Sequence, residues 1–144
     1  IDYLAIASWG HDVFRNKVRA KGPHQGELVN KVVYERLKGR VAVIASGGIN
    51  SKEKALEALE NADLVGLSTP FITDPEFAVK IQEGNESDIQ LTMKPEALEA
   101  LAIPKAAFKD IVPLMDFGES LEKEARDFFR GLEANYEGRE TGEN

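Results

Sequence analysis

Three short apolar runs, each closed by a turn of small or polar residues, set the pattern of this chain. The runs cover residues 2–7, 41–45 and 63–67. The middle run is apolar at every position, which is typical of a parallel strand that is covered on both faces. We therefore expect three β-strands, and the apolar periodicity between and after them predicts helices.

Helical periodicity fills the spaces between these runs. An apolar stripe over residues 28–37 precedes the second run and is followed by Gly39, a residue that suits the C-terminal end of a helix. Asn50 is predicted to cap the next helix, whose apolar side, including Leu56 and Leu59, we expect to face inward. Strands that alternate with helices over short connections form parallel sheets, so the predicted fold class is α/β with the order β-α-β-α-β-α.

Small residues follow each of the last two predicted strands. Gly47 and Gly48 follow the middle run, and Ser68 and Thr69 follow the last one. Neighbouring parallel strands end at the same edge of a sheet, so such turns place free backbone N–H groups side by side. The turns after strands seven and eight hold phosphate in this way in many (β/α)8 barrels. We predict a phosphate site at these four residues, against the alternative that both turns are purely structural.

The chain changes character near residue 84. Residues 85–88 are polar, and two short helices opened by proline, a longer helix capped near Asp116 and a polar tail follow. We therefore predict three β/α units over residues 1–84 and a helical extension over residues 85–144. A complete barrel needs about 250 residues. A chain of 144 residues that opens on a strand-like run is thus expected to be the C-terminal (β/α)3 portion of a longer barrel.

Composition narrows the class of function. The chain is 42% hydrophobic and 30% charged, which is typical of a globular protein. A net charge of −7 disfavours nucleic-acid binding, and the absence of a bilayer-length apolar run and of a signal peptide predicts a cytoplasmic protein without a membrane partner. There is no cysteine, and His11 and His24 lack metal-ligand spacing, so no metal site is expected.

Other polar residues have two interpretations each. Four cations occupy alternate positions of one segment: Arg15, Lys17, Arg19 and Lys21. They form either a solvated face or a basic rim that attracts the phosphate of an anionic cofactor. Trp9 and His11 follow the first predicted strand, on the barrel face where active sites form, so they are either loop residues or contacts of a substrate or flavin. His24 is a weaker candidate of the same kind.

Residues 3–84 resemble the C-terminal part of the Old Yellow Enzyme family, the FMN-dependent NAD(P)H oxidoreductases built on a (β/α)8 barrel. The resemblance lies in residues 2–8, 43–49 and 62–75, and its most discriminating feature is the Pro-Phe-Ile-x-Asp-Pro continuation after the last strand. It implies that the chain contains barrel strands six, seven and eight. In the intact protein, the resemblance implies hydride transfer from NADH or NADPH to FMN and then to an activated alkene or a similar small molecule.

The sequence departs from the family at one important position. The family has Gly-Arg where this chain has Ser68-Thr69, and in the family the arginine contacts the FMN phosphate. Arginine is a bidentate, charged partner, whereas threonine offers a hydroxyl and a backbone N–H without charge. The family's catalytic residues lie on earlier strands, so no catalytic residue is assigned and the segment alone is expected to be inactive. Two alternatives remain: a phosphate-binding barrel isomerase or lyase, and a non-catalytic relative that has lost FMN.

The predicted sheet leaves surfaces that something has to cover. Three parallel strands cannot close a barrel, so both edges of the sheet are open. We expect Val41, Val43 and Ala45 to form an apolar inner face that is covered by self-association or by the C-terminal helices. If FMN binds without the family arginine, a cation of the basic run is expected to replace it.

Overall fold

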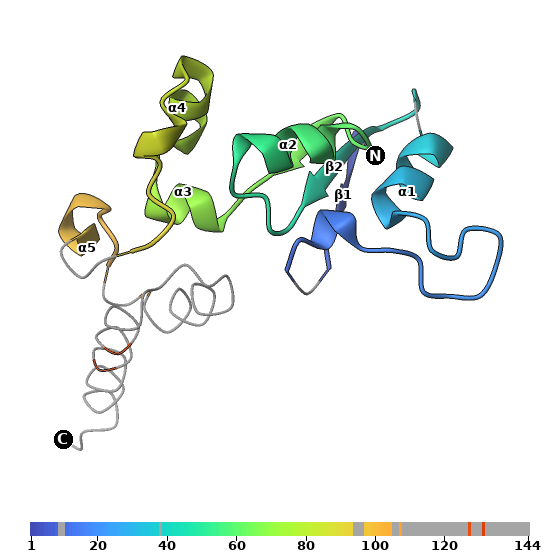
Figure 1. Ribbon diagram of the computed structural model, residues 1–144, viewed down its shortest axis with the longest axis horizontal. Helices are drawn as coiled ribbons and strands as arrows, with labels where there is room; N and C mark the ends of the chain where they lie inside the picture. The colour runs from blue at the N-terminus through green and yellow to red at the C-terminus, as the bar shows by residue number, and fades with distance from the viewer. Residues whose placement is uncertain are drawn as a thin grey trace. The chain divides into compact units, whose positions relative to one another are not determined.

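The computed structural model describes residues 1–8, 11–37, 39–93 and 97–104, together with residues 107, 127 and 131. The chain divides into two compact units, residues 1–68 and residues 69–144 (Figure 1). The predicted boundary between residues 84 and 85 came from the change in sequence character and stays a prediction. Each unit is described separately below.

A three-stranded parallel sheet forms the basis of the first unit. Its strands β1 (Tyr3–Ile6), β2 (Ala42–Ser46) and β3 (Leu64–Gly66) lie in the order β1-β2-β3. The register pairs Ala5 with Ile44 across the first two strands. All three strands point the same way and therefore end at one edge of the sheet. The α/β class with parallel strands is thus confirmed, and the arrangement is consistent with a portion of a barrel-like fold.

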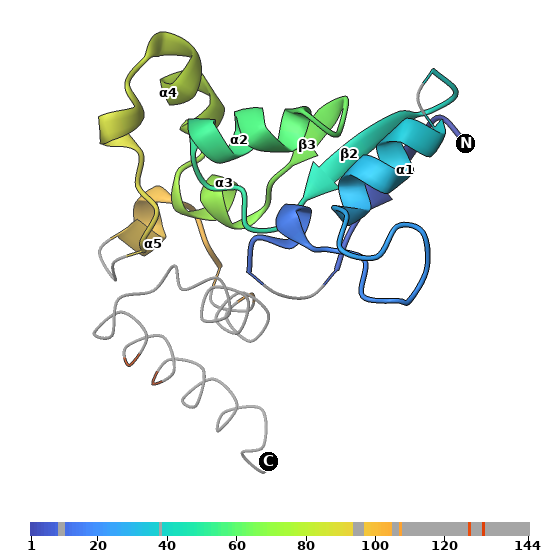
Figure 2. The same cartoon turned by 45° about the vertical axis from the view of Figure 1, so that its right-hand side comes forward.

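Helices cover one face of this sheet. The 3₁₀ helix η1 (Val13–Arg15) follows β1, α1 (Val29–Leu37) precedes β2, and α2 (Lys52–Leu59) connects β2 to β3. Helix α1 packs against β2, and α2 packs against β3 (Figure 2). Val43 and Ala45 of β2 are completely buried within the apolar core that these elements share. The loops that follow the three strands lie at the carboxyl edge of the sheet, and this core holds them there.

The other face of the sheet is the exposed one. Side chains alternate along a strand, so Val43 and Ala45 point toward the helices, whereas Tyr3 and Leu64 lie on the opposite face. Tyr3 is 61% exposed and Leu64 is 52% exposed. The expectation that Val41, Val43 and Ala45 form an inner face covered by self-association or by the C-terminal helices was wrong for Val43 and Ala45, because these two side chains pack against residues of α1 and α2. Tyr3 and Leu64 lie on the opposite, exposed face of the sheet.

Helix α2 differs from its prediction at its start and on its apolar side. Ser51 rather than Asn50 is the N-cap, and its hydroxyl accepts a hydrogen bond of 3.2 Å from the backbone N–H of Lys54. Leu56 is 59% exposed and Leu59 is 39% exposed. The helix packs on the core through its alanines instead, because a small side chain lets the helix approach the sheet closely.

The second unit begins with two short helices, α3 (Thr69–Thr73) and α4 (Phe77–Glu83). A turn separates them, in which the N–H of Phe77 donates to the carbonyl of Asp74 at 3.0 Å. Because of this turn, α4 begins at Phe77 and not directly after the proline that follows Asp74. The rings of Phe71 and Phe77 meet edge to face, with their centroids 5.9 Å apart, and so join the two helices.

Asp74 holds the following segment in place. Its carboxylate is 4% exposed and accepts hydrogen bonds from Nζ of Lys80 at 2.7 Å, from the N–H of Gln90 at 2.9 Å and from the N–H of Glu76 at 3.1 Å. Burial alone would raise the pKa of Asp74, but the bonds from Lys80 and the two backbone groups hold that pKa below its usual value. These bonds connect α4 to the chain beyond η2 (Glu86–Asp88).

Helix α5 (Ala97–Ala100) lies within the first helix predicted for the extension. Apart from single positions, the helices predicted over residues 104–112 and from Asp116 onward lie outside the described residues. Among the helices that the structure describes, none combines the length and the apolar character that crossing a bilayer requires.

Candidate functional site

The predicted glycine turn directly follows β2. Gly47 and Gly48 have φ values of +92° and +81°, which side chains of L-residues rarely adopt. A Cβ on Gly47 would lie 2.6 Å from the Cβ of Val13, and a Cβ on Gly48 would lie 2.6 Å from the Cα of Asp12. Glycine is therefore required at both positions, because the backbone has a positive φ there and because the loop after β1 leaves no room for a Cβ.

The second predicted turn follows β3. Because β2 and β3 are parallel neighbours, Ser68 lies at the same edge of the sheet as Gly47 and Gly48, and it is exposed. Thr69 is the first residue of α3 in the second unit, where its carbonyl accepts a 3.4 Å hydrogen bond from the hydroxyl of Thr73. The first unit thus brings three of the four predicted residues to one edge. Phosphate binding there stays a prediction.

Four charged side chains connect the loop after β1 to the glycine turn and to α2. Nζ of Lys54 donates to Asp12 at 2.7 Å and to the carbonyl of Gly48 at 3.2 Å. Arg15 donates to the other oxygen of Asp12 at 2.7 Å. Two further N–H groups of Arg15 donate to the two carboxylate oxygens of Glu57, at 2.8 and 2.6 Å. The forked guanidinium therefore joins α2 to the loop after β1.

The network keeps its carboxylates ionised. Burial raises the pKa of Asp12, but hydrogen bonds and charge from Lys54 and then Arg15 outweigh it and lower that pKa overall. The hydrogen bond from Arg15 likewise lowers the pKa of Glu57, and Glu57 raises the pKa of Arg15 further. Two carboxylates and two cations leave the network without net charge, so it is a neutral cluster beside the glycine turn.

The sequence alone does not reveal the Asp12–Lys54 pair, because its members are 42 residues apart. One local signal was available. A lysine in the first turn of a helix opposes the helix dipole, so Lys54, in the first turn of the helix that follows the glycine turn, favours a nearby carboxylate. Asp12 has φ +46°, and aspartate is one of the few residues with a side chain that tolerates this region.

The structure divides the basic run. Arg15 belongs to the charged network, and its guanidinium also lies 5.0 Å from the ring centroid of Phe14. Lys17 forms an antiparallel backbone bridge with Leu28, and Lys17, Arg19 and Lys21 are exposed. This placement fits the solvated-face interpretation for the last three cations. Their predicted contact with a cofactor phosphate stays a prediction.

The two histidines lie in different surroundings. His11 is exposed and directly precedes Asp12 of the charged network, and Trp9 lies outside the described residues. Nδ1 of His24 lies 3.0 Å from Oε1 of Glu27. Within the described residues, no three His, Asp or Glu side chains gather in a way that could hold a metal ion.

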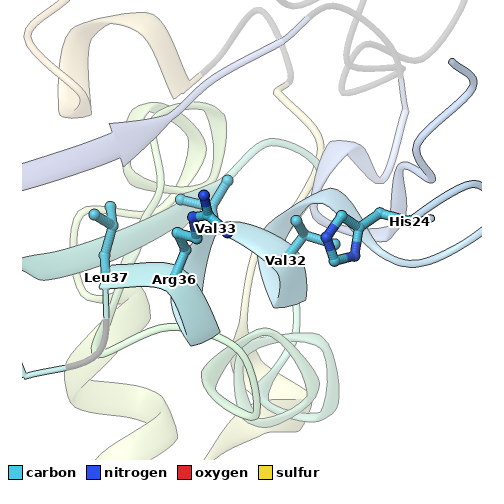
Figure 3. A pocket seen from close by; sticks show the side chains of 5 residues that line it. All are labelled: His24, Val32, Val33, Arg36 and Leu37. Atoms are coloured by element: carbon cyan, nitrogen blue, oxygen red, sulfur yellow. The ribbon is translucent and has the colours of Figure 1, made fainter. Parts of the chain in front are cut away.

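An apolar hollow of about 510 Å³ runs along α1 (Figure 3). Its lining residues are His24, Val32, Val33, Arg36 and Leu37. Figure 3 shows Val32, Val33, Arg36 and Leu37 along α1, with His24 on the preceding loop near Val32. The size is that of small-molecule sites. The valines come from the apolar stripe that predicted α1, and they line this hollow instead of the centre of the core.

The chain is similar to two proteins that are named as oxidoreductases. The chain is 59% identical over 136 residues to an uncharacterized oxidoreductase of Streptococcus pyogenes serotype M5 (strain Manfredo), and the match covers 94% of this chain and 34% of that protein. It is 31% identical over 113 residues to a Bacillus subtilis (strain 168) protein named "Probable NADH-dependent flavin oxidoreductase YqiG", covering 78% of this chain and 29% of that protein. The first of these relatives is thus named as an oxidoreductase, and the second, more distant one is named as an NADH-dependent flavin oxidoreductase.

A third match belongs to another class of enzyme. The chain is 35% identical over 82 residues to the 4-hydroxy-tetrahydrodipicolinate synthase of Stutzerimonas stutzeri (strain A1501), covering 57% of this chain and 26% of that protein. No family model matches the chain. The chain spans 34%, 29% and 26% of the lengths of these three relatives, so the similarity concerns a segment of each of them.

Proposed function

We propose that this chain is the C-terminal (β/α)3 segment of an FMN-dependent NAD(P)H oxidoreductase of the Old Yellow Enzyme type, acting in the cytoplasm. The similarity to a protein named as an NADH-dependent flavin oxidoreductase carries this proposal. The parallel sheet supports it, because Gly47-Gly48 and Ser68 follow neighbouring strands at one edge. In this role the segment anchors the FMN phosphate through Gly47, Gly48, Ser68 and Thr69, and its strands complete the barrel.

The chemistry of this segment is binding rather than catalysis. FMN, when bound, supplies a carrier that accepts hydride from NADH or NADPH and passes it to a small-molecule acceptor. Backbone N–H groups at the two turns would donate to the phosphate, and the hydroxyls of Ser68 and Thr69 would add neutral donors. A phosphate carries nearly two negative charges, so neutral donors hold it less strongly than an arginine does.

The residues present fit a phosphate in most respects. Two adjacent glycines with positive φ leave their backbone unshielded by side chains, and Lys54 brings a cation to the carbonyl of Gly48. The carboxylate of Asp12 is the feature that opposes an anion, because its Oδ1 would lie 2.9 Å from a Cβ on Gly48. The fit of a phosphate therefore depends on how far neighbouring cations neutralise the charge of this carboxylate.

The test uses the complete polypeptide that carries this sequence. We expect a yellow protein that releases FMN on denaturation and oxidises NADH or NADPH. Ser68→Asp places a negative charge in the phosphate site and should weaken FMN binding about tenfold or more. Ser87→Asp, at an exposed serine of η2, is the matched control and should leave the affinity unchanged. A colourless protein that neither binds added FMN nor oxidises NADH or NADPH overturns the proposal.

Two other functions each have one observation in their favour. The match to a synthase favours an enzyme that is not an oxidoreductase, and a phosphate-binding isomerase or lyase is the alternative of that kind. That protein would be colourless, and phosphorylated small molecules would raise its melting temperature. Ser68-Thr69 in place of Gly-Arg favours a non-catalytic relative, which neither FMN nor phosphorylated compounds would stabilise. A thermal-shift series with FMN and sugar phosphates separates the three functions.

A further inference from the structure

The carboxylate of Asp12 lies directly against the glycine turn. Its Oδ1 accepts the 2.7 Å bond from Lys54, and the same lysine donates to the carbonyl of Gly48 at 3.2 Å. The lysine thus bridges the carboxylate and the turn. The cation beside the predicted phosphate site already has an anion as its partner.

Asp12 is held in this position from two sides. Its backbone adopts a left-handed conformation, with φ +46° and ψ +47°, at the start of η1. Its second oxygen accepts the bond from Arg15, which Glu57 of α2 holds through both carboxylate oxygens. The side chains of Asp12 and Lys54 are 30% and 26% exposed, so this pair is more shielded from solvent than Arg15 and Glu57, at 44% each.

We propose that Asp12 restrains anion binding at the glycine turn by acting as a built-in counter-ion for Lys54. While the Asp12–Lys54 pair is closed, the ammonium group donates to a carboxylate of the protein, and the carboxylate repels an incoming phosphate. When the pair opens, Lys54 supplies the charge that Ser68-Thr69 lacks. The inference rests on the phosphate-binding role proposed for the turn, and it names the cation of that site and the group that controls it.

Of the two carboxylates in the network, Asp12 controls whether Lys54 is free, and Glu57 does not. Loss of the Asp12 charge frees Lys54, whereas Arg15 keeps Glu57 as a partner. Loss of the Glu57 charge leaves Arg15 bonded to Asp12 alone and keeps the Asp12–Lys54 pair closed. The two carboxylates of one network therefore have different effects on the turn, although each substitution changes the net charge equally.

The test compares three variants in the complete polypeptide, with FMN and inorganic phosphate as probes. Asp12→Asn keeps the shape and the tolerance of positive φ, and we expect it to tighten the binding of both probes about tenfold. Adding Lys54→Gln to Asp12→Asn should cancel that gain. Glu57→Gln is the matched control and should change either affinity by less than about twofold.

A second measurement reads the lysine directly. The acetylation rate of Lys54 by acetic anhydride, followed by peptide mass spectrometry, should rise in Asp12→Asn and fall when phosphate is added. If Asp12→Asn binds FMN and phosphate no more tightly than the wild type, Asp12 is a structural group and the inference is overturned, while FMN binding by the wild type still upholds the proposed function. If no variant binds either probe and phosphate does not protect Lys54, both fail.

Discussion

Replacing Asp74 with alanine removes a carboxylate that is 4% exposed and that accepts three hydrogen bonds within the second unit. The bond from Lys80 is charge-assisted and the other two come from backbone N–H groups. Bonds to a charged group contribute about 1.5–3 kcal/mol each, and part of this is offset because the carboxylate no longer has to be buried. We expect Asp74→Ala to lower the free energy of unfolding of this unit by about 2–4 kcal/mol.

Two further variants locate the source of this loss. Asp74→Asn keeps an oxygen that can accept a backbone bond but removes the charge, so its loss should be about half as large. Glu83→Ala is the matched control, because Glu83 is an exposed carboxylate on α4 that accepts a 3.3 Å bond from Asn85. A surface change of this kind alters stability by about 0.5 kcal/mol or less.

The pH dependence gives an independent check. The pKa of Asp74 is lowered from its ordinary value of 3.8, so its contribution is complete above that value and is lost as the pH falls through the lower folded-state pKa. The difference in unfolding free energy between wild type and Asp74→Asn should therefore be constant from about pH 7 to about pH 5 and shrink toward about pH 2.

Urea unfolding, combined with the hydrogen exchange of the Gln90 and Glu76 amides that donate to Asp74, measures these effects in the second unit. Faster exchange of both amides is expected in Asp74→Ala. Two results would contradict the reasoning: a loss in Asp74→Ala no larger than that in Glu83→Ala, or a wild-type advantage that does not change at acid pH.

Three further predictions concern the predicted site and the sheet. Thr69→Arg restores the charge of the family motif and should tighten FMN binding by the complete polypeptide about tenfold; an unchanged affinity would place Thr69 away from the phosphate. Gly48→Ala should lower the free energy of unfolding by about 2 kcal/mol or more in thermal or urea unfolding, because its Cβ meets the backbone of Asp12. Gly26→Ala, at φ +85° in open space, is the control and should lower it by about 1 kcal/mol. Equal losses in the two variants would show that the close approach at Gly48 is unimportant. Leu64→Glu on the exposed sheet face should reduce self-association of the 144-residue chain, as measured by analytical ultracentrifugation. Leu56→Glu, on the outer side of α2, is the control and should leave self-association unchanged. An identical mass distribution for both variants would exclude the sheet face as the contact between copies.

Local sequence pattern was sufficient for the elements themselves. The continuous apolar run before Gly47 predicts β2, because a strand of a parallel sheet excludes polar side chains. Gly39 predicts the end of α1, because glycine readily adopts the positive φ that ends many helices, and its φ is 78°. The two adjacent glycines likewise predict a turn, since their conformations are open to few other residues. Placement of Ser68 at the same edge then follows from the parallel order that short helical connections impose.

Only the tertiary structure decided which surfaces and which charges meet. Alternation along β2 shows that Val43 and Ala45 share a face, but only the packing of the helices identifies the face that they bury, and it was not the predicted one. The Asp12–Lys54 pair, 42 residues apart, arises because parallel neighbouring strands bring the loop after β1 and the start of α2 together. A periodic pattern records the neighbours of a residue along its own element, whereas contacts between elements depend on register and approach, which no local pattern contains.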